Sequence, residues 1–414
     1  MSELLDKARE VKEAAAVLAQ LDAGEKNSAL YRIAEALREN TDPIIEANSM
    51  DTELGRRAGM SASLLDRLTL NEARIMDIAA GVEKVAELHD PIGEVIEEFE
   101  RPNGMIITKV RVPLGVIGLI YEARPNVTVD SAALSLKAGS GVILRGSDSA
   151  INSNKKLVEV IRAALSGTAV PPGCVTLIET GGHGVVDEMM NLTQYLDVLI
   201  PRGGAALISR VVNNSRVPVL ETGSGNCHVY FHRDADPEMA ENIIVNAKVQ
   251  RPSVCNAAET LLVHRDFLPR VGPALQALKD RGVTIHGDDA IREIFPEALP
   301  ATEEDYATEY LSLDIAVKTV DSLEGAIEHI SGYGTKHTEC IVTQDAAAAQ
   351  KFLNEVDAAC VNHNVSTRFT DGFEFGFGAE IGISTQKMHA RGPMGLREIT
   401  SYKYLVRGNG QVRG

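Results

Sequence analysis

Apolar residues recur every three or four positions near the start of the chain, as in Leu5, Ala8, Val11, Ala15 and Leu18. Charged residues fall mostly between them, so this spacing predicts a helix with one apolar face. The same rhythm in residues 29–37 and 75–88 predicts two more helices. Between residues 94 and 112, apolar and polar residues alternate around the segment 101–104 (Arg-Pro-Asn-Gly), which predicts a β-hairpin closed by that turn.

From residue 112 onward, short apolar runs without alternation are separated by helical segments. Such runs are typical of strands covered on both faces, and the helices between them favour doubly wound parallel sheets, which bind ligands at the carboxyl ends of their strands. A first series of predicted strands covers residues 116–121, 142–145, 174–178, 198–200, 217–220 and 229–231. A second series covers residues 260–263, 283–286, 313–317, 340–343 and 359–361. The fold class is therefore α/β with two doubly wound domains, and a last strand at 401–406 is expected to join the hairpin in a small sheet.

Cys255 lies in a polar loop between a predicted helix at 238–248, opened by Asp236-Pro237, and a predicted strand at 259–264. A reactive thiol needs access to solvent and an environment that lowers its pKa from about 8.5, whereas structural cysteines usually lie among aliphatic neighbours. The loop alone leaves two interpretations open, a nucleophile and a small apolar side chain that fills a gap.

The composition narrows the class of protein. A chain of 414 residues exceeds one ordinary core, so two or three domains are expected. No apolar run reaches the roughly 18 residues of a membrane span and the first residues are charged, which predicts a cytoplasmic protein without a membrane partner. The net charge of −17 argues against nucleic acid as a partner, but a small anionic substrate needs only a few local cations. The five cysteines are dispersed, which indicates neither a disulfide framework nor a metal site.

A dinucleotide fingerprint Gly-x-Gly-x-x-Gly is missing, because Asp187 stands where the third glycine after Gly182 and Gly184 would be. The better candidate is the pair Gly203 and Gly204, which lies between a predicted strand and a helix. Exposed N–H groups and the helix dipole at such a turn can hold a pyrophosphate. An ordinary strand-to-helix turn is the alternative interpretation.

Several motifs together resemble the aldehyde dehydrogenase superfamily. They are residues 124–127 (Arg-Pro-Asn-Val) after the first strand, 142–147 after the second, 221–223 (Glu-Thr-Gly), and Cys255, which follows Glu221 by 255 − 221 = 34 residues. The longer segments 121–128, 326–341 and 389–396 resemble, within that superfamily, the gamma-glutamyl phosphate reductases.

The resemblance implies an aldehyde dehydrogenase-like fold and the positions of its domains along the chain. Residues 1–93 and 111–232 would form the dinucleotide-binding domain and residues 233–394 the catalytic domain. Residues 94–110 and 395–414 would form a β element used in oligomerisation. The implied activity is the NADPH-dependent reduction of L-glutamyl 5-phosphate to L-glutamate 5-semialdehyde in proline biosynthesis. A hydrolytic NAD(P)-dependent aldehyde dehydrogenase, a non-catalytic protein that keeps the fold and a cysteine hydrolase are the alternatives.

The resemblance also implies the catalytic residues. Cys255 would attack the acyl group, and the Asn126 amide with the Cys255 backbone N–H would stabilise the oxyanion. Glu221 matches the water-activating glutamate of hydrolytic relatives, but its surroundings differ from their Glu-Leu-Gly-Gly-Lys. Its role as a base or only in positioning stays open.

The remaining implied residues bind the cofactor and the substrate. Arg145 and Ser147 would meet the 2′-phosphate of NADP, and Glu309 would lie near the nicotinamide ribose. The cations expected to bind the substrate's carboxylate and phosphate are those within the family-like motifs, namely Arg124, Lys336, His337 and Arg391. A homo-oligomer is expected, and glutamate 5-kinase is a possible partner because glutamyl phosphate is labile.

Overall fold

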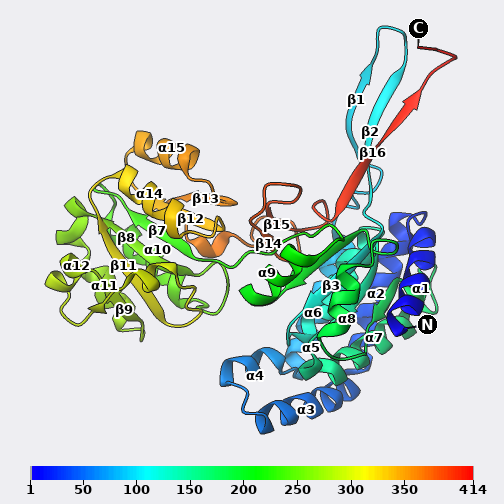
Figure 1. The fold of residues 1–414 in the computed structure, drawn as a ribbon, viewed down its shortest axis with the longest axis horizontal. Helices are drawn as coiled ribbons and strands as arrows, with labels where there is room; N and C mark the ends of the chain where they lie inside the picture. Colours follow the sequence, from blue (N-terminus) through cyan, green and yellow to red (C-terminus); the bar gives the residue numbers. More distant parts are fainter. Residues whose placement is uncertain (1, 414) are drawn as a thin grey trace. The chain divides into compact units, whose positions relative to one another are not determined.

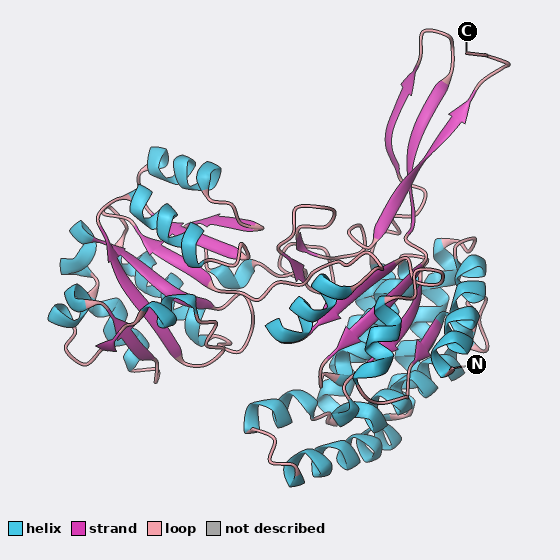
Figure 2. Cartoon of the chain, viewed as in Figure 1, coloured by secondary structure: helices cyan, strands magenta, loops and turns pink. Residues whose placement is uncertain are grey.

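The computed structural model describes residues 2–413, and the chain forms two compact units (Figure 1). Unit 1 comprises Met1–Glu221, Gly376–Gly382 and Met394–Gly414, and unit 2 comprises Thr222–Phe375 and Ile383–Pro393. Both units combine helices with β-sheets (Figure 2). The predicted α/β class is therefore confirmed.

The three helices predicted from the apolar rhythm are present in unit 1. They are α1 (Glu3–Leu18), α2 (Ala23–Glu39) and α5 (Glu72–Glu87). Between them lie two helices that the sequence analysis did not predict, α3 (Thr41–Arg57) and α4 (Ala62–Leu68). Side chains fix where α1 and α2 begin, because Ser2 accepts from the N–H of Leu5 and Asp22 forms a reciprocal capping box with Glu25.

The first parallel sheet has the strand order β5-β4-β3-β6. Its strands are β3 (Val116–Tyr121), β4 (Gly141–Arg145), β5 (Val175–Leu177) and β6 (Val198–Arg202), and its helices are α6 (Pro125–Lys137), α7 (Ile151–Leu165), α8 (His183–Met190) and α9 (Ala205–Asn214). The apolar face of α1 belongs to the same buried cluster as residues of β3 and β4. The strand predicted at 217–220 is reduced to one bridge, Leu199 to Val219.

A three-stranded antiparallel sheet, in the order β1-β2-β16, completes unit 1 (Figure 2). Its strands are β1 (Val95–Glu100), β2 (Ile106–Pro113) and β16 (Thr400–Arg407). The hairpin turn contains Gly104 at φ +80°, a conformation that glycine adopts without strain. The predicted hairpin and its pairing with the last strand are both confirmed.

Unit 2 is built on a seven-stranded parallel sheet in the order β10-β9-β11-β8-β7-β12-β13. Its strands are β7 (Cys227–Phe231), β8 (Ala258–His264), β9 (Thr284–Gly287), β10 (Leu299–Pro300), β11 (Asp314–Val320), β12 (Thr338–Val342) and β13 (Cys360–His363). The helices are α10 (Pro237–Val249), α11 (Gly272–Lys279), α12 (Asp289–Ile294), α13 (Glu303–Ala307), α14 (Leu323–Tyr333) and α15 (Ala346–Glu355), and a short ribbon pairs β14 (Ile383–Ser384) with β15 (Gly392–Pro393).

Two separate apolar clusters cover the two faces of this sheet. Residues of α10, α11 and α12 pack with Val229, Phe231 and Leu261 on one face. Residues of α14 and α15 pack with Tyr230, Leu262 and Ile341 on the other. Successive residues of each strand therefore enter different cores, which explains why these strands read as continuous apolar runs.

The strand at 229–231, assigned to the first series by the sequence analysis, belongs to the second sheet. As β7, it pairs in parallel with β8 and β12 at the centre of that sheet. The two compact units accordingly divide after Glu221, before the predicted boundary at 232/233. Apolar runs identify strands, but they do not show which sheet a strand joins.

Candidate active site

Cys255 lies in the loop between α10 and β8, as predicted, and therefore at the amino end of β8. Its side chain is partly exposed, whereas Cys174, Cys227, Cys340 and Cys360 are buried. Burial raises the pKa of the Cys174 and Cys340 thiols to about 12 and raises that of Cys227 well above its ordinary value. Among the five cysteines, Cys255 is the one with the access that a nucleophile needs.

The backbone of Cys255 packs directly against the segment that enters β7. A Cβ atom added to Gly225 would lie 1.5 Å from the Cys255 carbonyl oxygen, so only glycine fits there. The Gly225 N–H donates to the Glu309 carboxylate at 2.7 Å, and the Cys227 thiol donates to the Cys255 carbonyl at 3.2 Å. Glu309 and Cys255, both predicted site residues, are thus linked through one glycine.

A buried ion pair brackets the nucleophile loop. Lys248, near the end of α10, lies 2.5 Å from Glu259, near the start of β8, and both side chains are fully buried. Burial raises the pKa of Glu259 to about 7, although Lys248 opposes that change. Glu259 also accepts from the N–H of Leu311, two residues beyond Glu309. The ion pair therefore connects both ends of the loop to the Glu309 segment.

Arg368 is a second residue at this loop that the sequence analysis missed. It lies in a single 3₁₀ turn, Thr367–Phe369, and hydrogen-bonds to Gln250 and Asn256. No local pattern marks it, because its partners lie 118 and 112 positions away in the sequence.

Two of the predicted substrate cations in unit 2 converge on one carboxylate. Arg391 lies 2.7 Å and Lys336 lies 3.4 Å from Asp357, and Lys387, which the sequence analysis did not consider, lies 2.9 Å away. Arg391 and Lys387 hold the pKa of Asp357 far below its usual value, with the hydrogen bond from Arg391 as the largest cause. Three positive charges around one negative charge leave an excess that can attract an anion.

His337, another predicted substrate residue, is fully buried. Its Nδ1 lies 2.8 Å from the Thr338 hydroxyl and 3.7 Å from the Cys227 sulfur. The side chain therefore lies in the protein interior behind Cys227, away from solvent, unlike the exposed side chain of Lys336.

Asn126 and Arg124 lie in unit 1, where the chain leaves β3 and enters α6. Arg124 is the residue immediately before the helix, and Asn126 is in its first turn. The Asn126 amide donates to Asp130 at 3.0 Å. Burial raises the pKa of Asp130 to about 6, against the opposing effects of Asn126 and Arg202. The carboxyl group of Asp130 thus orients the predicted oxyanion donor, a role that the sequence analysis did not identify.

Arg145 and Ser147, the predicted cofactor residues, follow β4. The Arg145 guanidinium is almost fully buried and forms an ion pair with Asp148 at 2.7 Å. The Ser147 hydroxyl accepts from the N–H of Ser149 and caps the next turn. Asp148 itself is largely exposed, so the outer end of this cluster is a carboxylate.

Gly203 and Gly204 form the turn between β6 and α9, as predicted. The Glu122 carboxylate accepts from the Gly204 N–H at 3.0 Å, and a Cβ atom on Gly203 would lie 2.6 Å from the Glu122 carboxyl carbon. The backbone N–H of this turn therefore already donates to an anionic group, as it would to a pyrophosphate. Glu221, the other predicted catalytic residue, follows α9 and is the residue at which the first segment of unit 1 ends.

The two units use opposite edges of their sheets. In unit 1 the predicted residues follow β3, β4 and β6 at the carboxyl edge, as expected for a doubly wound sheet. In unit 2, Cys255, Glu309 and Lys336 all lie in connections from a helix into a strand, which reach the amino edge. The general rule thus does not hold for the nucleophile, because its loop follows a helix instead of a strand.

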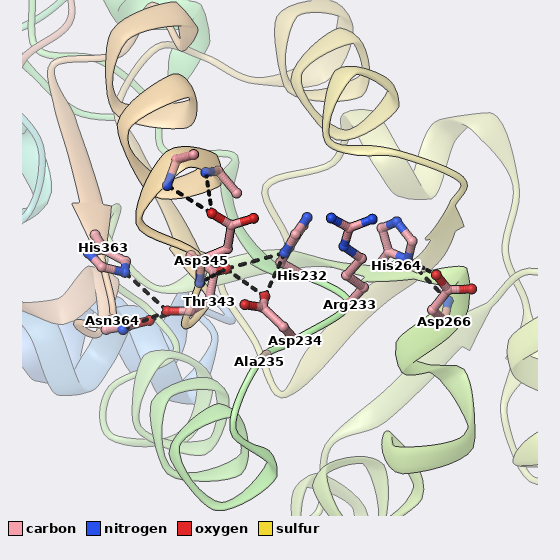
Figure 3. Close-up of polar contacts among 12 residues, drawn as sticks. His232, Arg233, Asp234, Ala235, His264, Asp266, Thr343, Asp345, His363 and Asn364 are labelled. Carbon is pink, nitrogen blue, oxygen red and sulfur yellow. Dashed lines mark hydrogen bonds and ion pairs between the residues drawn. The ribbon is translucent and has the colours of Figure 1, made fainter.

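The carboxyl edge of the unit 2 sheet holds a separate polar cluster (Figure 3). His232 Nδ1 lies 2.6 Å from the Asp234 carboxylate, and the Thr343 hydroxyl donates to the same carboxylate at 2.7 Å. The Asn364 amide donates to the Thr343 carbonyl at 2.9 Å. These hydrogen bonds join the segments that follow β7, β12 and β13, which stabilises the sheet at the edge opposite Cys255.

Comparisons with known proteins identify the relatives of this chain. The model of the aldehyde dehydrogenase family matches residues 2–291. The chain is 57% identical to a gamma-glutamyl phosphate reductase of Carboxydothermus hydrogenoformans and 56% identical to one of Halalkalibacterium halodurans, each match covering 100% of both chains. The crystal structure of gamma-glutamyl phosphate reductase from Thermotoga maritima is 51% identical, with a TM-score of 0.97 over 100% of both chains. An acetylating aldehyde dehydrogenase from Geobacillus thermoglucosidasius shares the fold at 17% identity and a TM-score of 0.73, covering 100% of this chain and 98% of that chain.

The chain therefore belongs to the aldehyde dehydrogenase family and, within it, to the gamma-glutamyl phosphate reductases. The predicted aldehyde dehydrogenase-like fold and the family resemblance are both confirmed. Within residues 2–413, no helix is long and apolar enough to cross a membrane.

Proposed function

We propose that this protein reduces L-glutamyl 5-phosphate to L-glutamate 5-semialdehyde and phosphate with NADPH, the second step of proline biosynthesis. The observation that carries the proposal is the partly exposed Cys255 on a loop braced by Gly225 and the buried Lys248–Glu259 pair. The closely similar relatives are named for this reaction.

The Cys255 thiolate attacks the acyl carbon and expels phosphate, which leaves a thioester. NADPH, when bound, supplies the hydride that reduces this thioester to a thiohemiacetal. The thiohemiacetal loses a proton as its carbon–sulfur bond breaks, which releases the semialdehyde and regenerates the thiolate. Oxyanions form in both stages, and the Asn126 amide, oriented by Asp130, and the Cys255 N–H are the proposed donors.

The cofactor is proposed to be held by residues at the carboxyl edge of the unit 1 sheet. The turn of Gly203 and Gly204 would bind the pyrophosphate in place of the Glu122 carboxylate, to which the Gly204 N–H donates in the structure. Arg145 and Ser147 bind the 2′-phosphate, for which Arg145 exchanges its partner Asp148 for the phosphate. Glu309 holds the nicotinamide ribose and remains close to the Gly225 backbone.

The substrate's anionic groups are proposed to bind to the predicted cations of the family-like motifs. Lys336 and Arg391 share Asp357 with Lys387, and this excess positive charge suits a carboxylate or a phosphate. Arg124 precedes α6, next to Asn126. Burial favours an indirect role for His337, in support of the backbone near Cys227.

We also infer assembly into a homo-oligomer through the sheet β1-β2-β16. Every residue of β1 is exposed, and Tyr402, Tyr404 and Val406 of β16 are each at least half exposed. An apolar, unpaired strand edge of this kind is a template for pairing with another copy. Glutamate 5-kinase is a proposed partner, because the labile acyl phosphate benefits from direct transfer. The cytoplasm is the proposed location.

The test is an assay of semialdehyde oxidation with NADP and phosphate, in which each component is omitted in turn. Oxidation should require phosphate, and arsenate should replace it, because phosphate is the expected acceptor of the acyl group. Glu221→Gln should reduce the rate by less than the ~10²–10⁴-fold that loss of a catalytic base causes. Oxidation that proceeds without phosphate and collapses in Glu221→Gln would favour the hydrolytic alternative.

A further inference from the structure

Arg368 spans the loop that carries Cys255. Its Nε donates to the Gln250 side chain at 2.8 Å, and its Nη1 donates to the Asn256 side-chain oxygen. Gln250 is the residue that ends α10, and Asn256 directly follows Cys255. One guanidinium group therefore holds both ends of the segment 250–256.

Asn256 is fixed a second time on the same side. Its amide donates to the Thr370 carbonyl at 2.8 Å, and the residue is only 3% exposed. Arg368 and Thr370 belong to the same turn, which Ser366 begins by accepting from the Arg368 N–H. The side chain next to the nucleophile thus has its oxygen and its nitrogen bound by one short segment.

The charge of Arg368 interacts with the charged and titratable groups around the loop. Burial and Arg251 lower the pKa of Arg368, while Asp371, Cys255 and Cys227 raise it. This interaction is mutual, so the cation that is stabilised by a thiolate stabilises that thiolate in return. The titratable or charged groups that interact with Arg368 or with Cys227 include Arg251, Asp371, Cys255, His337, Glu259, Glu309 and Glu339.

Most of these neighbouring groups do not favour a negative sulfur. Lys248 neutralises Glu259, and Glu339 is buried beside His228. Arg251 is exposed and therefore screened by solvent. Arg368, from the turn Thr367–Phe369, is partly buried and is fixed to this loop by two side-chain hydrogen bonds.

We propose that Arg368 is the positioning residue of the nucleophile loop and the fixed cation that maintains Cys255 as a thiolate. The inference rests on the proposed function in one respect, that Cys255 is the nucleophile. Arg368 acts through Cys255 and Asn256, without itself contacting the reacting carbon.

The test measures the rate of Cys255 alkylation by iodoacetamide against pH, in the full-length protein without substrate or cofactor. The variants are Arg368→Gln, which removes the charge, Arg368→Lys, which keeps the charge but loses the planar fork, and Gln250→Ala, which removes one exposed anchor. Arg265→Gln is the matched control, because this arginine of unit 2 pairs with Asp321 on the surface.

Arg368→Gln should raise the alkylation midpoint by about one pH unit and slow labelling at neutral pH about tenfold. Arg368→Lys should restore the midpoint, because the charge remains, and Arg265→Gln should leave it unchanged. Gln250→Ala should raise the midpoint by less than Arg368→Gln does, because it removes one of the two hydrogen bonds that fix the guanidinium. An equal midpoint in Arg368→Gln and Arg265→Gln overturns the proposal and leaves Arg368 a purely structural role.

If Arg368→Gln does not fold, Asp371→Asn provides the same test with an isosteric change. Asp371 opposes Arg368 electrostatically, so its neutralisation should lower the alkylation midpoint by a few tenths of a pH unit. An unchanged midpoint contradicts the proposal. Failure of the proposed function is recognised separately, because alkylation of Cys255 would then leave the reductase activity intact.

Discussion

At the scale of single residues, access and burial separate Cys255 from the other thiols. Cys255→Ser should fold and bind cofactor but lose nearly all turnover, because a hydroxyl is far less nucleophilic than a thiolate at neutral pH. Turnover and cofactor titration measure both effects. Cys174→Ser is the control, since Cys174 is buried in unit 1 and burial raises its pKa. Retained activity in Cys255→Ser, or first labelling of Cys227, would exclude the assignment.

Arg145 decides which nicotinamide cofactor is preferred, if it binds a 2′-phosphate. Arg145→Ala should raise KM for NADPH much more than KM for NADH, because only NADPH loses a charge-assisted hydrogen bond of about 1.5–3 kcal/mol. Asp148→Asn should lower KM for NADPH, since it releases the guanidinium from its present partner. Arg210→Ala, at a surface pair with Asp187, should change neither constant. Equal effects of Arg145→Ala on the two cofactors would assign Arg145 a structural role.

Asp130 should give the stability of the protein a measurable pH dependence. Its pKa of about 6 in the folded state exceeds the ordinary value of 3.8, because burial favours the neutral carboxyl group. The folded state then binds more protons than the unfolded state between about pH 4 and 6, so this group destabilises the protein as pH rises through that window. Asp130→Asn should remove that decline in the free energy of unfolding, which is on the order of 1 kcal/mol for each unit by which the pKa is raised. Urea titrations at pH 4.5 and 7 measure it, and parallel curves for both proteins would refute the shift.

At the scale of elements, the ion pair of Lys248 and Glu259 joins α10 to β8 across the nucleophile loop. Lys248→Met should destabilise the protein by about 3–5 kcal/mol, because it leaves Glu259 buried without its cation. Lys248→Met combined with Glu259→Leu should recover most of that loss. Lys351→Met, which breaks an exposed pair with Glu324, should have little effect on urea unfolding. A double variant as unstable as the single one would show that the pair is not the cause.

The elements themselves were largely predictable. The helices α1, α2 and α5 and the hairpin of β1 and β2 follow from periods of 3.6 and 2 in the apolar residues. The helices α3 and α4 were missed. The buried residues of α3 are mostly polar or small, such as Asn48 and Asp51, and include one large apolar residue, Ile44. Such a helix has no apolar stripe for the pattern to detect.

At the scale of the whole molecule, the sheet of β1, β2 and β16 should control assembly. Tyr404→Lys with Val406→Lys places two charges on one exposed face of β16 and should lower the molar mass measured by light scattering. Tyr31→Lys is the control, at a similarly exposed tyrosine in α2. An unchanged mass in the β16 variant would place the interface elsewhere.

The sequence by itself determined the class of fold, the hairpin, and the loop of Cys255 between a helix and a strand, because these follow from local periodicity and turn chemistry. Its motifs also determined the family. The sequence did not reveal that β7 belongs to the second sheet, because strand order depends on pairing between segments distant in the chain.

Only the tertiary structure decided what surrounds the nucleophile. Gly225 approaches the Cys255 carbonyl, Lys336 and Arg391 meet at Asp357, and Arg368 reaches Asn256 from 112 positions away. Gly225, Cys255, Lys336 and Asp357 lie in connections that enter the parallel strands β7, β8, β12 and β13, and these connections reach one edge of the sheet. Arg368 and Arg391 come from the segments that follow β13, around the antiparallel pair of β14 and β15. Residue types and spacing carry no information about such contacts, because side chains that are far apart in sequence become neighbours only when the sheet is assembled.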